Sequence, residues 1–332
     1  MRLTLVLREK NADEHLTFMR QIGVQGVATN PFCDPEKGYY EYSTLADLKT
    51  QIESHGLKFE SMGTPPWHLC YKWMLGLPDR DEQIENLQKS VRNMGAAGVP
   101  VLIYNIHALR FYRTPGQATE RGGALGTRFD MAQVKDAPLM AAGGGMDIRL
   151  IPESHRRPIG DDEMWDNLTY FLKAMVPVAE EAGVKLALHP DDPPVPSIAG
   201  VARIMRSPEA FRRAIEIVPS ACNGLKFCVG CFSEMGVDVA EEIRYFGNLK
   251  KIFFVDFRNV RGTADNFSET FPDDGKENMF EIMKAFRETG FDGAISPDHA
   301  MRISGDTEGR RQYWAYAIGH MRGLLQGLDS TV

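Results

Sequence analysis

The sequence predicts an α/β fold, a (β/α)8 TIM barrel with a long insertion after its fourth strand. Eight short runs rich in β-branched and aromatic residues alternate with longer amphipathic segments. The runs are almost wholly apolar, as parallel strands buried on both faces are. No Gly-x-Gly-x-x-Gly motif follows the first run, which argues against a doubly wound nucleotide-binding sheet. Because such a barrel needs about 250 residues, we expect residues 1–332 to form a single domain.

The strands and helices are predicted from their different hydrophobic periods. The predicted strands span 2–7, 24–29, 58–62, 99–104, 184–188, 225–229, 251–257 and 293–296. Clear helical patterns between them span 81–94, 162–182, 208–218, 237–246 and 278–289. In the first helix Ile84, Leu87 and Val91 recur at three- and four-residue spacing. Gly183 and Gly290 follow helix ends, where glycine is the usual stop signal.

The spacing of the strands breaks once, between the fourth and the fifth. They begin near residues 99 and 184, much farther apart than the roughly 30 residues of an ordinary βα unit. The excess, residues 106–160, is rich in glycine and arginine and opens onto the C-terminal face of the barrel, where active sites lie. We expect a lid with cationic groups for an anionic substrate; the alternatives are a solvated, partly disordered insert or an oligomer contact. The glycine-rich residues 141–146 lie in this loop, so they are not predicted to bind phosphate.

Charge and cysteine content limit the classes of partner. Lys and Arg number 38 against 45 Asp and Glu, a net charge of −7 that argues against nucleic acid or a membrane surface as a general partner. No apolar run approaches the roughly 20 residues that span a bilayer. The N-terminus is charged too early for a signal peptide. Five irregularly spaced cysteines predict reduced thiols in a cytoplasmic protein.

Four successive predicted strands finish in a residue that can bind a metal. These residues are His189, Cys228, Asp256 and Asp298. Neighbouring strands lie about 4.8 Å apart, so side chains at their ends can converge on one ion. A thiolate with an imidazole and carboxylates suits a divalent transition metal better than Mg²⁺ or Ca²⁺. Cys228 and Cys231 lack a second cysteine pair, so a structural zinc site is not expected.

Several segments together resemble one known family. They are GLPDRD (76–81), HPDDPP (189–194), NGLKFCVG (223–230), FRNVRG (257–262), DG (274–275), MFEIMK (279–284), PDH (297–299) and AIGHMRGL (317–324). With this spacing the chain is similar to the mannonate dehydratase family over most of its length, least well over 106–160.

The resemblance implies a xylose-isomerase-like TIM barrel that dehydrates D-mannonate to 2-keto-3-deoxy-D-gluconate. It implies Mn²⁺ as the cofactor, with Fe²⁺, Co²⁺, Ni²⁺ or Zn²⁺ as alternatives, and His189, Cys228 and Asp298 as metal ligands. The chain departs from the family at Asp256, where the family has His. It departs again after the fourth strand, where the family is acidic and aromatic but residues 106–113 read IHALRFYR.

Dehydration of a sugar acid also needs proton transfer and a group that binds the substrate carboxylate. We predict His299, His107 and Tyr112 as catalytic acid–base candidates. Arg258 is the predicted carboxylate clamp, because a guanidinium grips a carboxylate through two hydrogen bonds. The remaining predicted substrate-binding residues are Asn259, His68 and Asn105.

Two other functions remain open for this sequence. One is a metal-dependent isomerase or epimerase of a sugar or sugar derivative, which shares proton removal but lacks the elimination. The other is a non-catalytic barrel that senses a sugar acid. A nucleic-acid repair role, known on related barrels, is disfavoured by the acidic balance. We expect a small anionic sugar acid as substrate and a homo-oligomer, a dimer.

Overall fold

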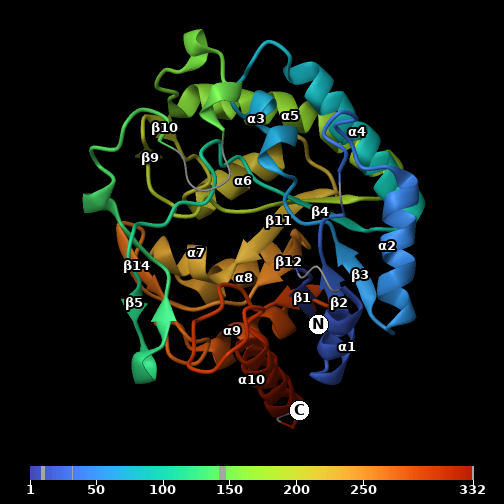
Figure 1. Cartoon of the computed structure of the whole chain (residues 1–332), viewed down its shortest axis with the longest axis vertical. Helices are drawn as coiled ribbons and strands as arrows, with labels where there is room; N and C mark the ends of the chain where they lie inside the picture. Colours follow the sequence, from blue (N-terminus) through green and yellow to red (C-terminus); the bar gives the residue numbers. More distant parts are fainter. Residues whose placement is uncertain (9–11, 32, 142–146, 331–332) are drawn as a thin grey trace.

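Eight parallel strands form the centre of the computed structural model, which describes residues 1–8, 12–31, 33–141 and 147–330 (Figure 1). They are β1 (Arg2–Val6), β2 (Gly26–Ala28), β3 (Lys58–Ser61), β4 (Val101–Tyr104), β8 (Lys185–Leu188), β11 (Asn223–Cys228), β12 (Ile252–Asp256) and β15 (Ala294–Ser296). Their order in the sheet is β3-β2-β1-β15-β12-β11-β8-β4. A parallel bridge between Met62 and Leu102 joins the two outer strands and closes the ring. The predicted TIM barrel is therefore confirmed.

Helices pack around this ring of strands (Figure 1). They are α1 (Ala12–Gln21), α2 (Tyr42–Ser54), α3 (Tyr71–Met74), α4 (Arg80–Ala97), α5 (Asp161–Ala182), α6 (Pro208–Ile217), α7 (Val229–Glu234), α8 (Val239–Asn248), α9 (Met279–Glu288) and α10 (Arg311–Ser330). The five helices predicted by pattern differ from α4, α5, α6, α8 and α9 only by a few residues at their ends. Gly183 caps α5 in the left-handed conformation, with φ of 67°. This confirms the stop signal that glycine gives after this helix.

The insertion contains short regular elements that its sequence pattern did not reveal. They are β5 (Ala118–Thr119), β6 (Leu125–Gly126) and β7 (Arg128–Asp130), with 3-10 turns at Arg121–Gly123, Met131–Gln133, Ile148–Leu150 and Glu153–His155. β7 pairs with the hairpin of β13 (Val260–Thr263) and β14 (Asn266–Glu269), which follows β12. The insertion is thus attached to the C-terminal half of the barrel, beside β14 at the left of Figure 1. Its role as lid or oligomer contact stays a prediction, and residues 142–146 of its glycine-rich stretch lie outside the described residues.

Two further small elements complete the loops. A two-stranded sheet forms from β9 (Ser197–Ile198) and β10 (Val201–Ala202), and a 3-10 turn spans Trp67–Leu69. Phe129 and Phe267 of the small sheet join Val195, Ile198 and Val260 in one buried apolar cluster. The loops at this end of the barrel therefore have a hydrophobic core of their own.

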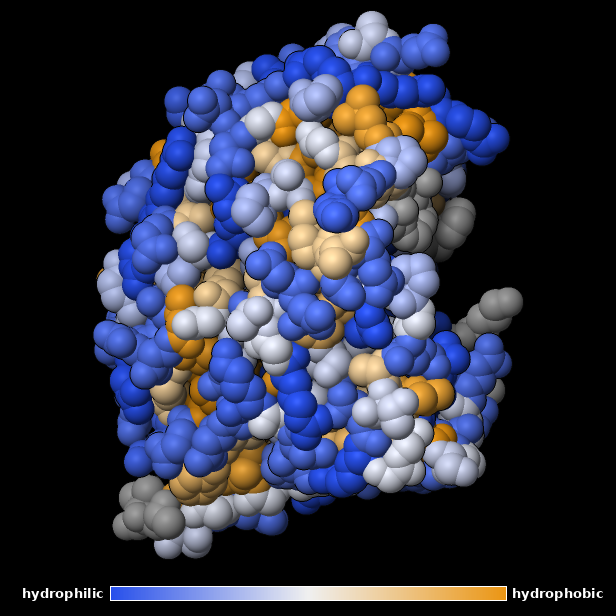
Figure 2. Space-filling model, turned by 90° about the vertical axis from the view of Figure 1, so that its left-hand side faces the viewer, coloured by the Kyte–Doolittle hydropathy of each residue, from blue (hydrophilic) through white to orange (hydrophobic). Residues whose placement is uncertain are grey.

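The barrel interior and the surface differ as expected for a protein in water. Apolar strand residues inside the barrel form a buried cluster that is separate from the larger core between strands and helices. This cluster includes Ala28, Ile103, Ala187 and Phe254. Figure 2 shows a mainly hydrophilic face interrupted by small apolar patches. In the part of the chain that the structure describes, no helix combines the length and the apolarity needed to cross a membrane.

Candidate active site

A cavity of about 1180 Å³ opens at the C-terminal ends of the barrel strands. Val6, Ala28 and Asp256, at the ends of β1, β2 and β12, lie in its wall. The wall also contains Arg8, Arg110, Phe111, His189, Lys226, Phe254, Asp298 and His299. Ionisable groups of both signs therefore face one space, where parallel barrels carry their active sites.

Strand register brings the four predicted metal ligands to this end of the barrel. Cys228 and Asp256 are the last residues of β11 and β12 and lie directly opposite each other. His189 follows β8 at once, and its backbone N–H donates to the Tyr104 carbonyl at 2.8 Å. Asp298 stands two residues beyond β15. Strand geometry predicts that these four residues lie together at one end of the barrel. The structure has this arrangement.

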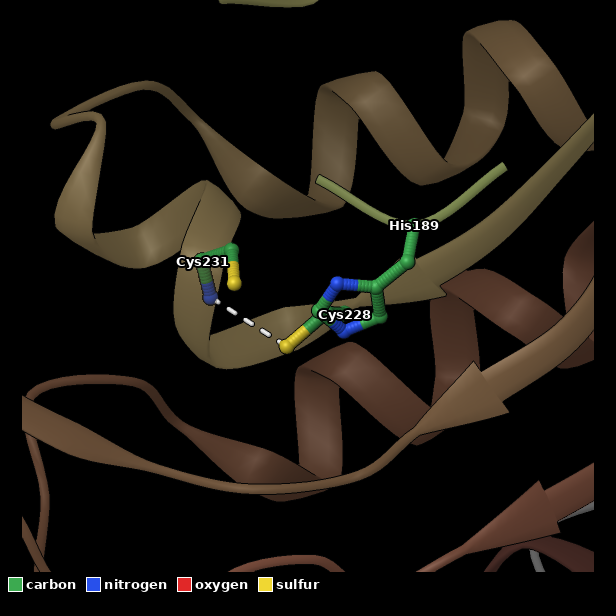
Figure 3. A group of neighbouring side chains, drawn as sticks. All are labelled: His189, Cys228 and Cys231. Atoms are coloured by element: carbon green, nitrogen blue, oxygen red, sulfur yellow. Dashed lines mark hydrogen bonds between the residues drawn. The ribbon is translucent and has the colours of Figure 1, made fainter. Parts of the chain in front are cut away.

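Cys228 lies between His189 and helix α7, in surroundings that favour its thiolate form by lowering its pKa. Its Sγ caps α7 and accepts a hydrogen bond from the Cys231 backbone N–H at 3.5 Å (Figure 3). Burial alone raises the pKa of Cys228, but Cys231, the Arg258 guanidinium and His189 hold that pKa well below its ordinary value. The opposite holds for Cys231, whose pKa is raised by burial and by the neighbouring Cys228. A cysteine binds a metal through its deprotonated sulfur, the thiolate.

Asp256 forms hydrogen-bonded ion pairs with two other groups of the cavity wall. Its Oδ2 lies 2.7 Å from the Lys226 Nζ and 3.2 Å from the His189 Nε2. Burial lowers the pKa of His189, but hydrogen bonds with Asp256 and Cys228 outweigh it and raise the pKa to about 9. In the absence of a metal, the imidazole of His189 is therefore protonated on both nitrogens and positively charged at neutral pH.

Asp298 and His299 form an ion pair in the wall of the cavity. The His299 Nε2 lies 3.1 Å from the Asp298 Oδ2, and its Nδ1 lies 3.2 Å from the Glu269 Oε1. Burial lowers the pKa of His299, but the two carboxylates raise it above the ordinary value. Burial raises the pKa of Asp298, and His299 and Lys226 bring it well below the usual range. The His299 side chain is 25% exposed and lines the cavity, and its raised pKa favours the protonated form.

The chemistry of these donors fits a divalent transition metal. Among the described residues, His189, Cys228 and Cys231 form a group whose ligand atoms all lie within 4.8 Å of one another (Figure 3). A second such group is Asp192, Cys231 and Glu234. Two predicted ligands, Asp256 and Asp298, belong to neither group, although the Asp256 carboxylate touches His189. A thiolate, an imidazole and nearby carboxylates are together a borderline-soft ligand set.

Arg258 occupies a different place from the predicted one. Its side chain is only 2% exposed and is absent from the described cavity wall. Nη1 donates to Glu234 at 2.8 Å and Glu269 at 3.1 Å, and Nη2 donates to Asp192 at 3.3 Å. The remaining Nε donates to the Cys228 Sγ at 3.3 Å. Because each nitrogen already has a partner, Arg258 holds the buried acids together and offers no free fork to a substrate carboxylate.

The other predicted site residues divide between the cavity and its supports. His299 lines the cavity, but His107, Tyr112, Asn259, Asn105 and His68 are not among the described residues of its wall. His107 is buried behind His189, with 5.7 Å between ring centroids, and its Nε2 contacts the Pro190 carbonyl. Burial lowers the pKa of His107 well below its ordinary value, so this imidazole is neutral.

The remaining four predicted residues lie in loops or hold them in place. Asn259 donates to the Pro272 and Glu277 carbonyls, at 3.1 Å and 2.9 Å. The Asn105 Oδ1 accepts a hydrogen bond from the His107 backbone N–H at 3.2 Å. His68 lies exposed in a 3-10 turn. Tyr112 packs at the edge of the small-sheet core. These contacts shape the walls of the cavity from behind.

Three cations of the described cavity wall, Arg8, Arg110 and Lys226, are not among the predicted site residues. Lys226 shares a strand face with Cys228 by the period of two, and that alternation was the available signal. The sequence predicts cationic groups in residues 106–160, but only the folded chain reveals that Arg110 is one of them that lacks a partner among the described residues. Asp192 is not among the predicted site residues, yet Arg113 binds its carboxylate through two hydrogen bonds, at 2.6 Å and 2.8 Å.

The chain matches known proteins along its whole length. A family model described as D-mannonate dehydratase (UxuA) matches residues 1–332. The mannonate dehydratase of Thermotoga maritima is 34% identical over 348 residues, which cover 97% of this chain and 96% of the relative. That of Streptococcus pneumoniae is 34% identical over 322 residues, covering 92% of this chain and 87% of the relative.

Solved structures agree with the sequence relatives. The crystal structure of mannonate dehydratase from Streptococcus suis serotype 2 superposes with a TM-score of 0.86 at 31% identity, covering 98% of this chain and 93% of that one. A D-tagatose 3-epimerase-like protein superposes with a TM-score of 0.61 at 15% identity over 100% of this chain and 99% of its own, a likeness of fold alone. With the family model, the relatives and the strand-end donors in agreement, this chain belongs to the D-mannonate dehydratase family.

Proposed function

We propose that the chain is a metal-dependent hydro-lyase that converts D-mannonate to 2-keto-3-deoxy-D-gluconate and water. The observation that carries this proposal is the set of strand-end donors beside one large cavity, in a chain that belongs to the D-mannonate dehydratase family. The cavity also contains cations, which suit an anionic sugar acid.

His189, Cys228, Asp256 and Asp298 are the proposed ligands of the metal. One thiolate and two carboxylates carry three negative charges, and Lys226 beside Asp256 offsets part of this charge. We propose Mn²⁺ as the resident ion, with Fe²⁺, Co²⁺, Ni²⁺ and Zn²⁺ as ions that the same donors accept. When bound, the ion supplies a Lewis acid that stabilises negative charge developing on substrate oxygens.

His299 is the proposed proton donor for the leaving hydroxyl. The C2 proton passes to solvent water in the cavity, the electron pair of the C2–H bond forms the C2=C3 double bond of the enol, and the C3–O bond breaks as the hydroxyl is protonated and leaves as water. His299 faces the cavity, and Asp298 and Glu269 on either side keep its imidazole protonated. His107 and Tyr112 lie behind the wall, so we assign them to positioning the loop after β4.

Incubation of the Mn²⁺-loaded protein with D-mannonate in D₂O, followed by proton NMR, tests the function. We expect 2-keto-3-deoxy-D-gluconate with one deuterium at C3, because the enol formed by elimination takes up its proton there from solvent. An isomeric sugar acid without loss of water would support the epimerase instead. Thermal stabilisation by D-mannonate without any conversion would support the sensor. Either result would overturn the dehydratase proposal.

We also propose a cytoplasmic homodimer without a nucleic-acid or membrane partner. All five cysteines are free thiols, as is usual in a reducing compartment. Leu139 and Leu150 of the insertion are 42% and 46% exposed and offer apolar surface to a second copy. Light scattering after size-exclusion chromatography tests this assembly, and a monomer mass at micromolar concentration would contradict it.

A further inference from the structure

Arg110 lies in a tight turn directly beside the proposed metal ligands. Its backbone N–H donates to the His107 carbonyl at 2.8 Å, and its own carbonyl accepts from the Arg203 Nη1 at 3.4 Å. The turn places Arg110 at φ of 68°, a left-handed conformation that a residue with a side chain rarely adopts. The next residue, Phe111, stands edge-on to His189 with 5.6 Å between ring centroids. The fold thus fixes Arg110 at the cavity wall, close to the metal ligands, in an unfavourable backbone conformation.

The guanidinium of Arg110 has no counter-ion among the described residues. Its Nε is buried and has no hydrogen-bond partner, and none of the described carboxylates lies within 4 Å of the group. Burial lowers the pKa of Arg110, and Cys70 is the only neighbour that opposes this effect. The Cys70 thiol is itself neutral, because burial raises its pKa to about 12. A half-buried positive charge is therefore left without compensation.

Most other cations around the cavity do have carboxylate partners. Arg113 binds Asp192 and Glu269, and Arg203 lies 3.5 Å from Asp191. The cavity-lining Lys226 and His299 are paired with Asp256 and Asp298, as described above. Arg8 also lines the cavity, but it is an exposed residue that water solvates. Arg110 is thus the partly buried cation whose missing partner must come from the cavity.

We propose that Arg110 binds the carboxylate of the substrate and thereby selects sugar acids over uncharged sugars. The inference rests on the proposed function only in taking a sugar acid as the substrate. Arg110 thereby takes the carboxylate-binding role that the sequence predicts for Arg258. The nitrogen donors of Arg258 are all directed at buried acids and thiols. A guanidinium at this place can offer the two parallel N–H donors that a carboxylate accepts.

The test compares Arg110→Gln and Arg110→Lys with wild-type, metal-loaded protein. Calorimetry of the same proteins before metal loading measures Kd for D-mannonate and for uncharged D-mannitol without turnover, and steady-state kinetics of the metal-loaded proteins measures KM and kcat. We expect Arg110→Gln to raise Kd and KM for D-mannonate about 10- to 100-fold, since a charge-assisted pair is lost. The Kd of D-mannitol should not change, and Arg110→Lys should recover part of the affinity.

Arg149→Gln is the matched control. Arg149 belongs to the same insertion, but its side chain is 86% exposed and pairs with Asp147, so this variant should bind D-mannonate like wild type. Thermal unfolding of each variant shows whether the turn has kept its fold. Binding of D-mannonate by Arg110→Gln within twofold of wild type would overturn the inference, as would wild-type protein that binds no sugar acid. Wild-type protein that binds D-mannonate without converting it would overturn only the proposed function, and the Kd comparison would still decide the role of Arg110.

Discussion

Individual side chains at the strand ends set the charge and protonation of the proposed metal site. The common position of His189, Cys228, Asp256 and Asp298 could be predicted, because residues at the ends of neighbouring parallel strands must meet at one edge, while their role as metal ligands stays a proposal. The sequence predicts cationic groups in residues 106–160, but it does not single out Arg110 among their arginines. An arginine is distinguished there only by the lack of a carboxylate near it, and that lack exists only once distant segments have packed together.

Lys226 should weaken metal binding, because its ammonium competes with the ion for Asp256 Oδ2 at 2.7 Å. We expect Lys226→Met to bind Mn²⁺ about tenfold more tightly, since a positive charge next to the ion is removed. Competition with a fluorescent chelator measures the affinity. Lys185→Met, at the exposed first position of β8, is the control and should leave it unchanged. Weaker binding by Lys226→Met would instead mean that the lysine holds Asp256 in place.

His189 should make metal binding depend on pH. Its pKa is raised to about 9, so the metal-free protein holds a proton there at pH 7, whereas a metal ligand must be neutral. Binding of Mn²⁺ at pH 7 should release about one proton, and affinity should rise roughly tenfold per pH unit until it levels off above pH 9. Calorimetry in two buffers with different ionisation enthalpies measures the released proton. A release near zero would show that His189 is already neutral or does not bind the ion.

At the scale of elements, the barrel was predictable and the small sheet of β7, β13 and β14 was not. The eight barrel strands are apolar runs separated by amphipathic helices, and each carries its own local signal. β7 has three residues and pairs with a hairpin far along the chain, so no hydrophobic periodicity in its own sequence predicts it. The pairing places Glu269 of β14 against Arg113, Arg258 and His299. The insertion therefore supports the active site through this sheet.

Phe267→Ala should loosen the insertion. Phe267 is 2% exposed, and its ring lies 5.9 Å from that of Phe129 across the pairing of β14 with β7. Removal of a buried phenylalanine ring costs about 3–5 kcal/mol. We expect a lower free energy of unfolding and faster proteolysis within residues 106–160. The exposed Thr263→Ala on β13 is the control, and equal proteolysis of the two variants would contradict a packing role for Phe267.

For the whole molecule, one buried guanidinium joins parts of the barrel that are distant in sequence. Arg258, just beyond β12, contacts Asp192 after β8, Glu234 in α7 and Glu269 in β14. Burial raises the pKa of Glu234 well above its ordinary value, while Arg258 and Arg113 lower it in part. The network therefore depends on Arg258 for its charge balance.

Arg258→Met should destabilise the protein by about 3–5 kcal/mol, because it leaves buried carboxylates without their cation. Urea unfolding followed by circular dichroism measures the change. The comparison variant is Arg244→Met, which breaks a half-exposed pair with Glu288 and should cost less than about 1 kcal/mol. Similar losses in the two variants would show that the Arg258 network contributes no more than a surface pair does.

The turn that carries Arg110 has a consequence for how this enzyme can change over evolutionary time. The proposed metal ligands lie at or just beyond the ends of β8, β11, β12 and β15, whereas Arg110 belongs to the loop after β4. Substitutions within residues 106–113 can therefore alter which molecule is accepted while the metal ligands stay as they are. Recruitment of this barrel to a new substrate needs changes in a stretch short enough to be exchanged as a unit.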